Sequence, residues 1–141
     1  MISPYEIVSK SALPALRAMV ARRLQLDYNM TQQQVASALG ITQASVSNYT
    51  RKTRGVMVDF EGDPMVAKAA DAIARGLSEE DPDRGKAMKS MTDVLDYIRL
   101  NHLMCSLHSD LEPGFQVKGC YACNGALSGK GFDRLRVLAG S

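Results

Sequence analysis

The stretch that most constrains the fold runs from Thr31 to Gly55, TQQQVASALGITQASVSNYTRKTRG. Apolar and small residues recur in it at helical spacing, which predicts two short helices. These residues are Val35, Ala36, Leu39, Ile41, Val46 and Tyr49. Gly40 separates the two runs and permits the left-handed backbone of a tight turn, and Thr42 stands at the N-cap of the second helix. The spacing therefore predicts a helix-turn-helix, a motif whose second helix enters a DNA groove; an ordinary helical hairpin is the alternative.

The second predicted helix presents uncharged side chains on its outer face. These are Gln43, Ala44, Ser47 and Asn48. Side chains of this size can reach base edges, so we expect them to contact bases. Arg51, Lys52 and Arg54 follow directly, where phosphates would lie, and Thr42 at the start of the helix is a further expected phosphate contact.

At these residues the sequence resembles the phage-repressor (Xre/Cro-like) type of helix-turn-helix domain. More narrowly, PYEIVSKSALPALRAMVARRL and TQQQVASALGITQASVSNY resemble a group of archaeal predicted transcriptional regulators. In that group, similar N-terminal domains stand alone, precede cysteine-containing tails, or are fused to a thiamine-phosphate synthase-like domain. The resemblance covers about the first 60 residues well and the remainder only loosely.

The resemblance also implies roles for individual residues. It implies that Gln43, Ala44 and Asn48 face bases, and it places four residues on the DNA backbone. These four are Gln32, Arg51, Lys52 and Arg54. Tyr5 departs from the group, in which many members have a cysteine there, and this departure weakens the case for a metal ligand from the N-terminus.

Charge divides the chain into a basic and an acidic part. Residues 1–60 hold seven Lys or Arg against three Asp or Glu, a net charge of +4, whereas residues 61–141 hold ten against twelve, a net charge of −2. The basic part contains the predicted helix-turn-helix, as attraction to phosphates requires. Double-stranded DNA is therefore the expected partner.

Composition predicts a cytoplasmic protein with no membrane segment. Apolar residues make up 45% of the 141 residues, which is enough for a core. No run of about 18 apolar residues occurs, and MISPYEIVSK lacks the pattern of a signal peptide. The three cysteines are odd in number and clustered late, which argues against a secreted disulfide framework.

A mainly α-helical bundle is expected around the helix-turn-helix. A short helix is predicted over residues 4–12, and Pro14 opens a longer one that runs to about Asp27. The arginines of this longer helix, Arg17, Arg22 and Arg23, suit either a solvated face or phosphate contact. The short apolar patch over residues 56–58 suits a loop or a strand of a small wing.

A further helix and an acidic boundary complete the predicted N-terminal domain. Asp63 and Pro64 predict the N-cap and first residue of a helix that stops at Gly76 and buries Met65 among others. We expect a DNA-binding domain over residues 1–77, a linker over 78–83, and a second domain over 84–141.

From Arg84 to about Met104 the apolar spacing alternates between three and four, which is typical of a coiled-coil seam. The seam comprises Met88, Met91, Leu95 and Ile98 and continues to His102 and Cys105. Such a helix can pack on its own bundle or pair with its twin. DNA readers of this type commonly place two recognition helices in successive grooves, which favours a homodimer.

Cysteine and histidine follow the seam at spacings typical of a metal site. Cys105 and His108 form a C-x-x-H pair, and Cys120 and Cys123 form a C-x-x-C pair between glycines. These four are the expected ligands of zinc or an iron-sulfur cluster, a choice left open. His102 and Asp110 are alternative fourth ligands.

The competing interpretation of these cysteines is three free or redox-active thiols without metal. A cluster or a thiol-disulfide pair would make this region a sensor of redox or metal state, whereas zinc would make it structural. Alternation in GFQVKGC and FDRLRVL favours two short strands that form a β-ribbon around the C-x-x-C turn.

Two other functional classes compete with the regulator. The first is a protein-interaction adaptor, such as an antitoxin-like partner. The second is a thiol-disulfide oxidoreductase, which normally needs a thioredoxin-like alternation of strands and helices that this sequence lacks. We therefore do not expect an enzyme.

Overall fold

A computed structural model describes residues 1–50 and 59–124, and within these ranges the chain is mainly helical and has no strand. The elements are α1 (Pro4–Ile7), the π-helical segment η1 (Val8–Ala12), α2 (Leu13–Leu26), α3 (Gln32–Leu39), α4 (Gln43–Thr50), α5 (Pro64–Leu77), α6 (Arg84–Leu100) and α7 (Cys105–Leu111). The predicted helical class is confirmed at this level. No helix in the described ranges is both long and apolar enough to cross a membrane.

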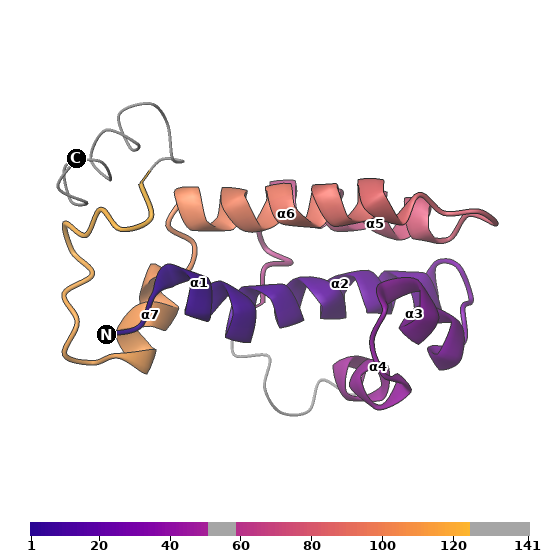
Figure 1. Cartoon of the computed structure of the whole chain (residues 1–141), viewed down its shortest axis with the longest axis horizontal. Helices are drawn as coiled ribbons and strands as arrows, with labels where there is room; N and C mark the ends of the chain where they lie inside the picture. Colours follow the sequence, from indigo (N-terminus) through magenta and orange to yellow (C-terminus); the bar gives the residue numbers. More distant parts are fainter. Residues whose placement is uncertain (51–58, 125–141) are drawn as a thin grey trace, which may run out of the picture.

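The first three elements form one rod rather than two separate helices (Figure 1). The N–H of Leu13 donates to the carbonyl of Val8, five residues back, which is the π-helical pattern. Pro14 has no N–H to donate, and it lies in the first turn of α2. The wide π turn therefore lets the chain pass Pro14 without a break.

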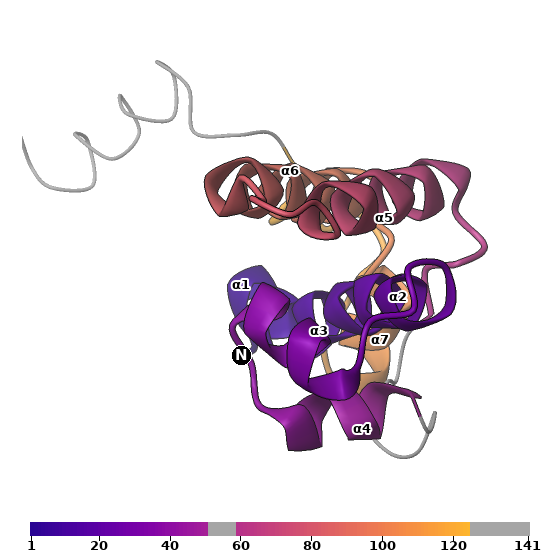
Figure 2. The same cartoon turned by 90° about the vertical axis from the view of Figure 1, so that its right-hand side faces the viewer.

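The other helices pack on this rod on two sides. The α5–α6 pair forms a layer along one side, whereas α3 and α4 lie on the other, near the C-terminal end of α2 (Figures 1 and 2). The short helix α7 lies at the opposite end, beside α1. Fully buried side chains come from α1 to α6 and make one core. The largest of them are Ile7, Leu16, Met19, Val20, Leu24, Val35, Val46, Val66 and Ile98.

The predicted start of α5 is confirmed. The Asp63 side chain accepts hydrogen bonds from the N–H groups of Met65 and Val66. The Tyr97 hydroxyl also donates to Asp63, at 3.3 Å to Oδ2, and so connects α6 to the cap of α5. Met65, expected to be buried, is 58% exposed because it lies on the outer side of the first turn.

Two further expectations differ from the structure. The first strand of the β-ribbon, GFQVKGC, is a series of turns over residues 114–120; its alternation reflects only half-buried Phe115 and Val117. The helix expected to reach Met104 ends at Leu100, because His102 adopts a left-handed backbone with φ of +59°. The second ribbon strand and the apolar patch at 56–58 lie outside the described residues.

Candidate functional site

The α3–α4 pair, residues 31–50, is shaped by caps that lie within its own sequence. Thr31 Oγ1 accepts the N–H of Gln34 at 3.1 Å, and the Gln34 side chain accepts the N–H of Thr31 at 2.9 Å. This reciprocal capping box satisfies two free amides at the start of α3. Gly40 ends α3 with φ of +67°, and Thr42 Oγ1 accepts the N–H of Ser45 at 3.1 Å. The predicted left-handed Gly40 and the Thr42 cap are both confirmed.

Burial fixes which side of α4 faces outward. Val46 is fully buried against the core that α2 and α3 also line, whereas Gln43, Ala44 and Asn48 are exposed. Ser47 is half-buried, as is Gln32 at the start of α3. The structure thus brings three of the four expected base-contacting residues onto one open face. Arg51, Lys52 and Arg54 lie outside the described residues.

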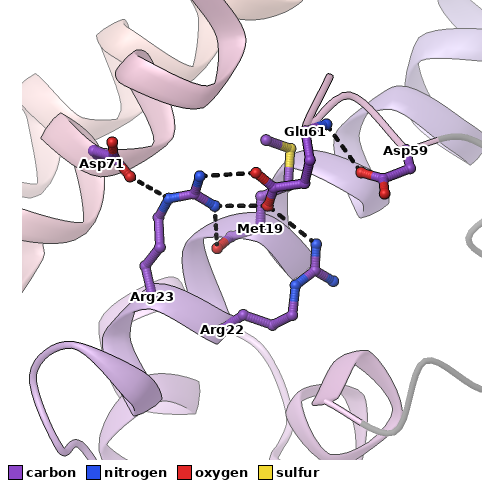
Figure 3. A network of polar contacts seen from close by, with 6 residues as sticks. All are labelled: Met19, Arg22, Arg23, Asp59, Glu61 and Asp71. Carbon is purple, nitrogen blue, oxygen red and sulfur yellow. Dashed lines mark hydrogen bonds and ion pairs between the residues drawn. The ribbon is translucent and has the colours of Figure 1, made fainter. Parts of the chain in front are cut away.

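Two of the three arginines on α2 are engaged within the chain (Figure 3). Arg23 makes two hydrogen bonds to the Glu61 carboxylate, at 2.8 and 2.9 Å, and also pairs with Asp71 of α5. Arg22 reaches the same carboxylate at 3.3 Å. Arg22 and Arg23 are therefore bound to acidic side chains of the same chain rather than forming a freely solvated face.

This network anchors Glu61, which follows residues 51–58 in the sequence, to α2. The hydrogen bonds from Arg23 hold the pKa of Glu61 below its usual value, and the partners of Arg23 raise the pKa of the guanidinium in turn. Phe60, next to Glu61, is buried in the core. The chain is therefore fastened to α2 just before α5 begins.

An apolar groove lies between the exposed part of α6 and the end of α3. The seam residues Met88, Met91 and Leu95 line it together with Leu13 of α2 and Leu39 of α3. Ile98, the fourth seam residue, is fully buried inside this chain, where it packs in the core. Ile98 is therefore unavailable to a partner, and the exposed seam is shorter than the sequence predicts.

The chain turns sharply after α6 and brings His102 back toward α7. His102 Nδ1 lies 3.6 Å from the Sγ of Cys105, the first residue of α7. His102 is exposed, Cys105 is half-buried, and both line a small pocket that Cys123 also reaches. The thiol and the imidazole therefore lie beside each other at the corner between α6 and α7.

The segment 112–124, here called the cysteine segment, places Cys120 and Cys123 near this pocket. All three cysteines are free and half-buried. Burial raises the pKa of Cys105 and of Cys123, and the neighbouring thiols raise each further. Arg99 opposes this rise at Cys123 and donates from Nη1 to the Cys123 carbonyl at 3.3 Å. Cys105 and Cys123 therefore line the same small pocket, whereas Cys120 lines the pocket formed by its own turn.

His108, the expected fourth ligand, lines the same small pocket but is engaged by other side chains. Its Nε2 lies 3.0 Å from Glu112 Oε2, and its ring stacks on Phe115 with centroids 4.3 Å apart. Glu112 also accepts the Ile2 N–H at 3.0 Å and pairs with the N-terminal ammonium. These contacts, with His108 first, lower the pKa of Glu112 to about 2. Asp110, the other alternative, is exposed.

Sequence reasoning missed the residues that connect distant parts of the chain. Glu61, Glu112 and Arg99 carry no motif, and each acts across tens of residues. Arg99 places its guanidinium carbon 6.0 Å from the centre of the Tyr5 ring while it holds the Cys123 carbonyl.

His102, Cys105 and Cys123 line one small pocket without forming a metal cage. Within residues 1–50 and 59–124, no three His, Cys, Asp or Glu side chains are already placed to hold a metal ion. Comparisons with protein-family models, with curated proteins and with solved structures found no match.

Proposed function

We propose that this protein is a sequence-specific, double-stranded DNA-binding transcriptional regulator in which α3 and α4 act as a helix-turn-helix. The observation that carries the proposal is the open face of Gln43, Ala44 and Asn48 on a helix whose other side is fixed by Val46. The basic residues Arg51, Lys52 and Arg54 follow α4 directly in sequence. This order suits a helix that reads bases and is held by phosphates.

The chemistry of the open face suits the major groove. The carboxamides of Gln43 and Asn48 can each make paired hydrogen bonds with adenine, and the Ala44 methyl suits contact with the thymine methyl. A fixed α4 helps because the two amides must reach base edges together. The caps of α3 and α4 fix the two helices relative to their own turns, and the Arg23–Glu61 network fixes the chain that follows residues 51–58 on α2.

The experiment is a selection from a random duplex pool, followed by affinity measurements over a series of salt concentrations. Asn48→Ala should lose about 1–3 kcal/mol on the selected duplex and relax its base preference, with the salt slope unchanged. Arg51→Ala should weaken binding to every duplex and reduce the salt slope by about 1.

Two control variants test whether the effects on DNA binding are specific to α4 and the residues after it. Gln116→Ala removes an exposed glutamine from the cysteine segment, and Lys68→Ala removes an exposed charge from α5; neither should alter base preference or salt slope. Absence of salt-dependent affinity for any duplex would refute the proposal.

We also propose that the regulator is a homodimer that pairs through the exposed part of α6. Met88 is 69% exposed at the edge of the apolar groove, so a twin helix would cover it. Met88→Glu should shift the molar mass measured by light scattering toward the monomer, whereas Met65→Glu, at a similarly exposed methionine on α5, should not. A monomeric wild-type protein would overturn the dimer and favour an adaptor that docks another protein here.

A further inference from the structure

The corner between α6 and α7 has the geometry of half a metal site. In a tetrahedral zinc site, with Zn–S of about 2.3 Å and Zn–N of about 2.0–2.1 Å, ligand sulfur and nitrogen lie about 3.6 Å apart. The distance between Cys105 Sγ and His102 Nδ1 is 3.6 Å. His102 has a left-handed backbone, with φ of +59°, a conformation uncommon outside glycine.

The other half of such a site is present in the C-x-x-C turn. The N–H of Ala122 points at Cys120 Sγ, with nitrogen and sulfur 3.4 Å apart. An amide directed at a sulfur stabilises the thiolate, which is the form that binds metal. Gly119, with φ of +78°, precedes Cys120 and turns the chain into this loop. Cys123 reaches the pocket that His102 and Cys105 line.

The structure favours a different histidine ligand from the one that residue spacing predicts. His108 lines the same small pocket, but its Nε2 pairs with Glu112 and its ring is stacked on Phe115. The Glu112 pair and the Phe115 stack fix the orientation of the His108 ring. His102 is exposed and its Nδ1 already lies 3.6 Å from Cys105 Sγ, so it is the better placed of the two imidazoles.

We propose that His102, Cys105, Cys120 and Cys123 form a tetrahedral zinc site that fastens the cysteine segment to the α6–α7 corner. Three thiolates and one imidazole are a common ligand set of structural zinc. The C-x-x-C turn must close on the corner, and the cysteine segment permits this because none of its residues is buried and none is helical. Binding displaces the thiol protons into solvent, so zinc uptake releases acid. The site stands independently of DNA binding.

The test uses the full-length reduced chain, freed of metal and titrated first with Co²⁺ and then with Zn²⁺. We expect one equivalent of each to bind, with the visible bands of tetrahedral cobalt and near-ultraviolet thiolate-to-cobalt charge transfer. His102→Ala and each Cys→Ser variant should lose more zinc affinity than the 10- to 100-fold typical of an outer-shell change. His108→Gln, the matched control, should bind zinc with near wild-type affinity.

A second variant distinguishes the loss of a metal ligand in His102→Ala from misfolding of that variant. His102→Cys should retain zinc and show stronger thiolate-to-cobalt charge transfer, because a fourth thiolate replaces the imidazole. Failure of the reduced wild-type chain to bind zinc would overturn the proposal, as would wild-type affinity in His102→Ala or loss of affinity in His108→Gln alone. A brown, iron-containing protein after anaerobic purification would overturn zinc in favour of an iron-sulfur cluster.

Discussion

The α3–α4 pair and the cysteine segment are held in place by different means. The α3–α4 pair buries Val35, Ala36 and Val46 in the shared core, and its ends are closed by side chains of its own sequence. The cysteine segment buries no residue and forms no helix. It is held by the contacts of Glu112 with His108 and the N-terminus, the Arg99 contact with Cys123, the stacking of Phe115, and single turns.

This contrast shows which region can respond to a ligand. We expect a helix pair fixed by apolar burial to keep its shape with or without DNA, because the free energy gained by burying its apolar side chains does not depend on a ligand. A segment with little burial gains most from an added bond, because such regions open at low free energy. We therefore expect a rigid DNA-binding surface and a metal-dependent cysteine segment in the same chain.

The largest expected difference comes from the same substitution made in both regions. Val46→Ala should lower the free energy of unfolding by about 2 kcal/mol, because two fully buried methyl groups are lost and a cavity remains. Val117→Ala, at a half-buried site in the cysteine segment, should change it by less than about 0.5 kcal/mol. Urea unfolding followed by circular dichroism measures the free energy of unfolding of both variants. Equal losses would contradict the difference between the α3–α4 pair and the cysteine segment.

A smaller difference is expected from the two glycines with positive φ. A Cβ at Gly40 or Gly119 would meet no atom within 4 Å, so only the left-handed backbone opposes alanine. Gly40→Ala should lower the free energy of unfolding by about 1–2 kcal/mol. Gly119→Ala should leave global unfolding almost unchanged and weaken zinc binding instead. Urea titration with and without Zn²⁺ separates the two effects; a global loss in Gly119→Ala would contradict the contrast.

The smallest expected effect is the loss of stability in acid, when protonation of Glu112 weakens its contacts with the N-terminus. Because the folded pKa of Glu112 is about 2 against a usual 4.5, its stabilisation is complete above about pH 4.5 and is lost as the pH falls toward 2. The difference in melting temperature between wild type and Glu112→Gln should therefore narrow below pH 4.5. Glu80→Gln, at an exposed residue of the linker, is the control. A difference that stays constant from pH 6 to pH 3 would show that Glu112 does not act through its charge.

Local features of the fold could be predicted because their partners are close in sequence. The Asp63 cap binds amides two and three residues away, and the Thr42 cap binds one three residues away. The end of α6 could not be predicted in this way. Its apolar spacing continues to Cys105, yet the helix stops at Leu100, because the backbone N–H of Leu103 bonds the Ile98 carbonyl after the His102 turn.

Of the candidate site residues, the sequence identified the types and only part of the arrangement. It placed Gln43, Ala44 and Asn48 on one face because helical period alone decides that. It preferred His108 over His102 although both lie three residues from Cys105, because spacing is symmetric and takes no account of Glu112 or Phe115. Ile98 was assigned to a partner helix because an apolar seam looks the same whether its own chain or a twin covers it.

By itself the sequence determined α3, α4 and the start of α5, with the caps at Thr42 and Asp63 and the tight turn at Gly40, since these depend on contacts within one helical turn. Only the tertiary structure decided that Arg23 meets Glu61, that Ile98 lies in the chain's own core, and that His102 rather than His108 stands beside Cys105. The physical reason is that those contacts join residues on different elements or across a break in a helix. Their geometry follows from how the rod, the α5–α6 layer and α7 pack together, which no local pattern encodes.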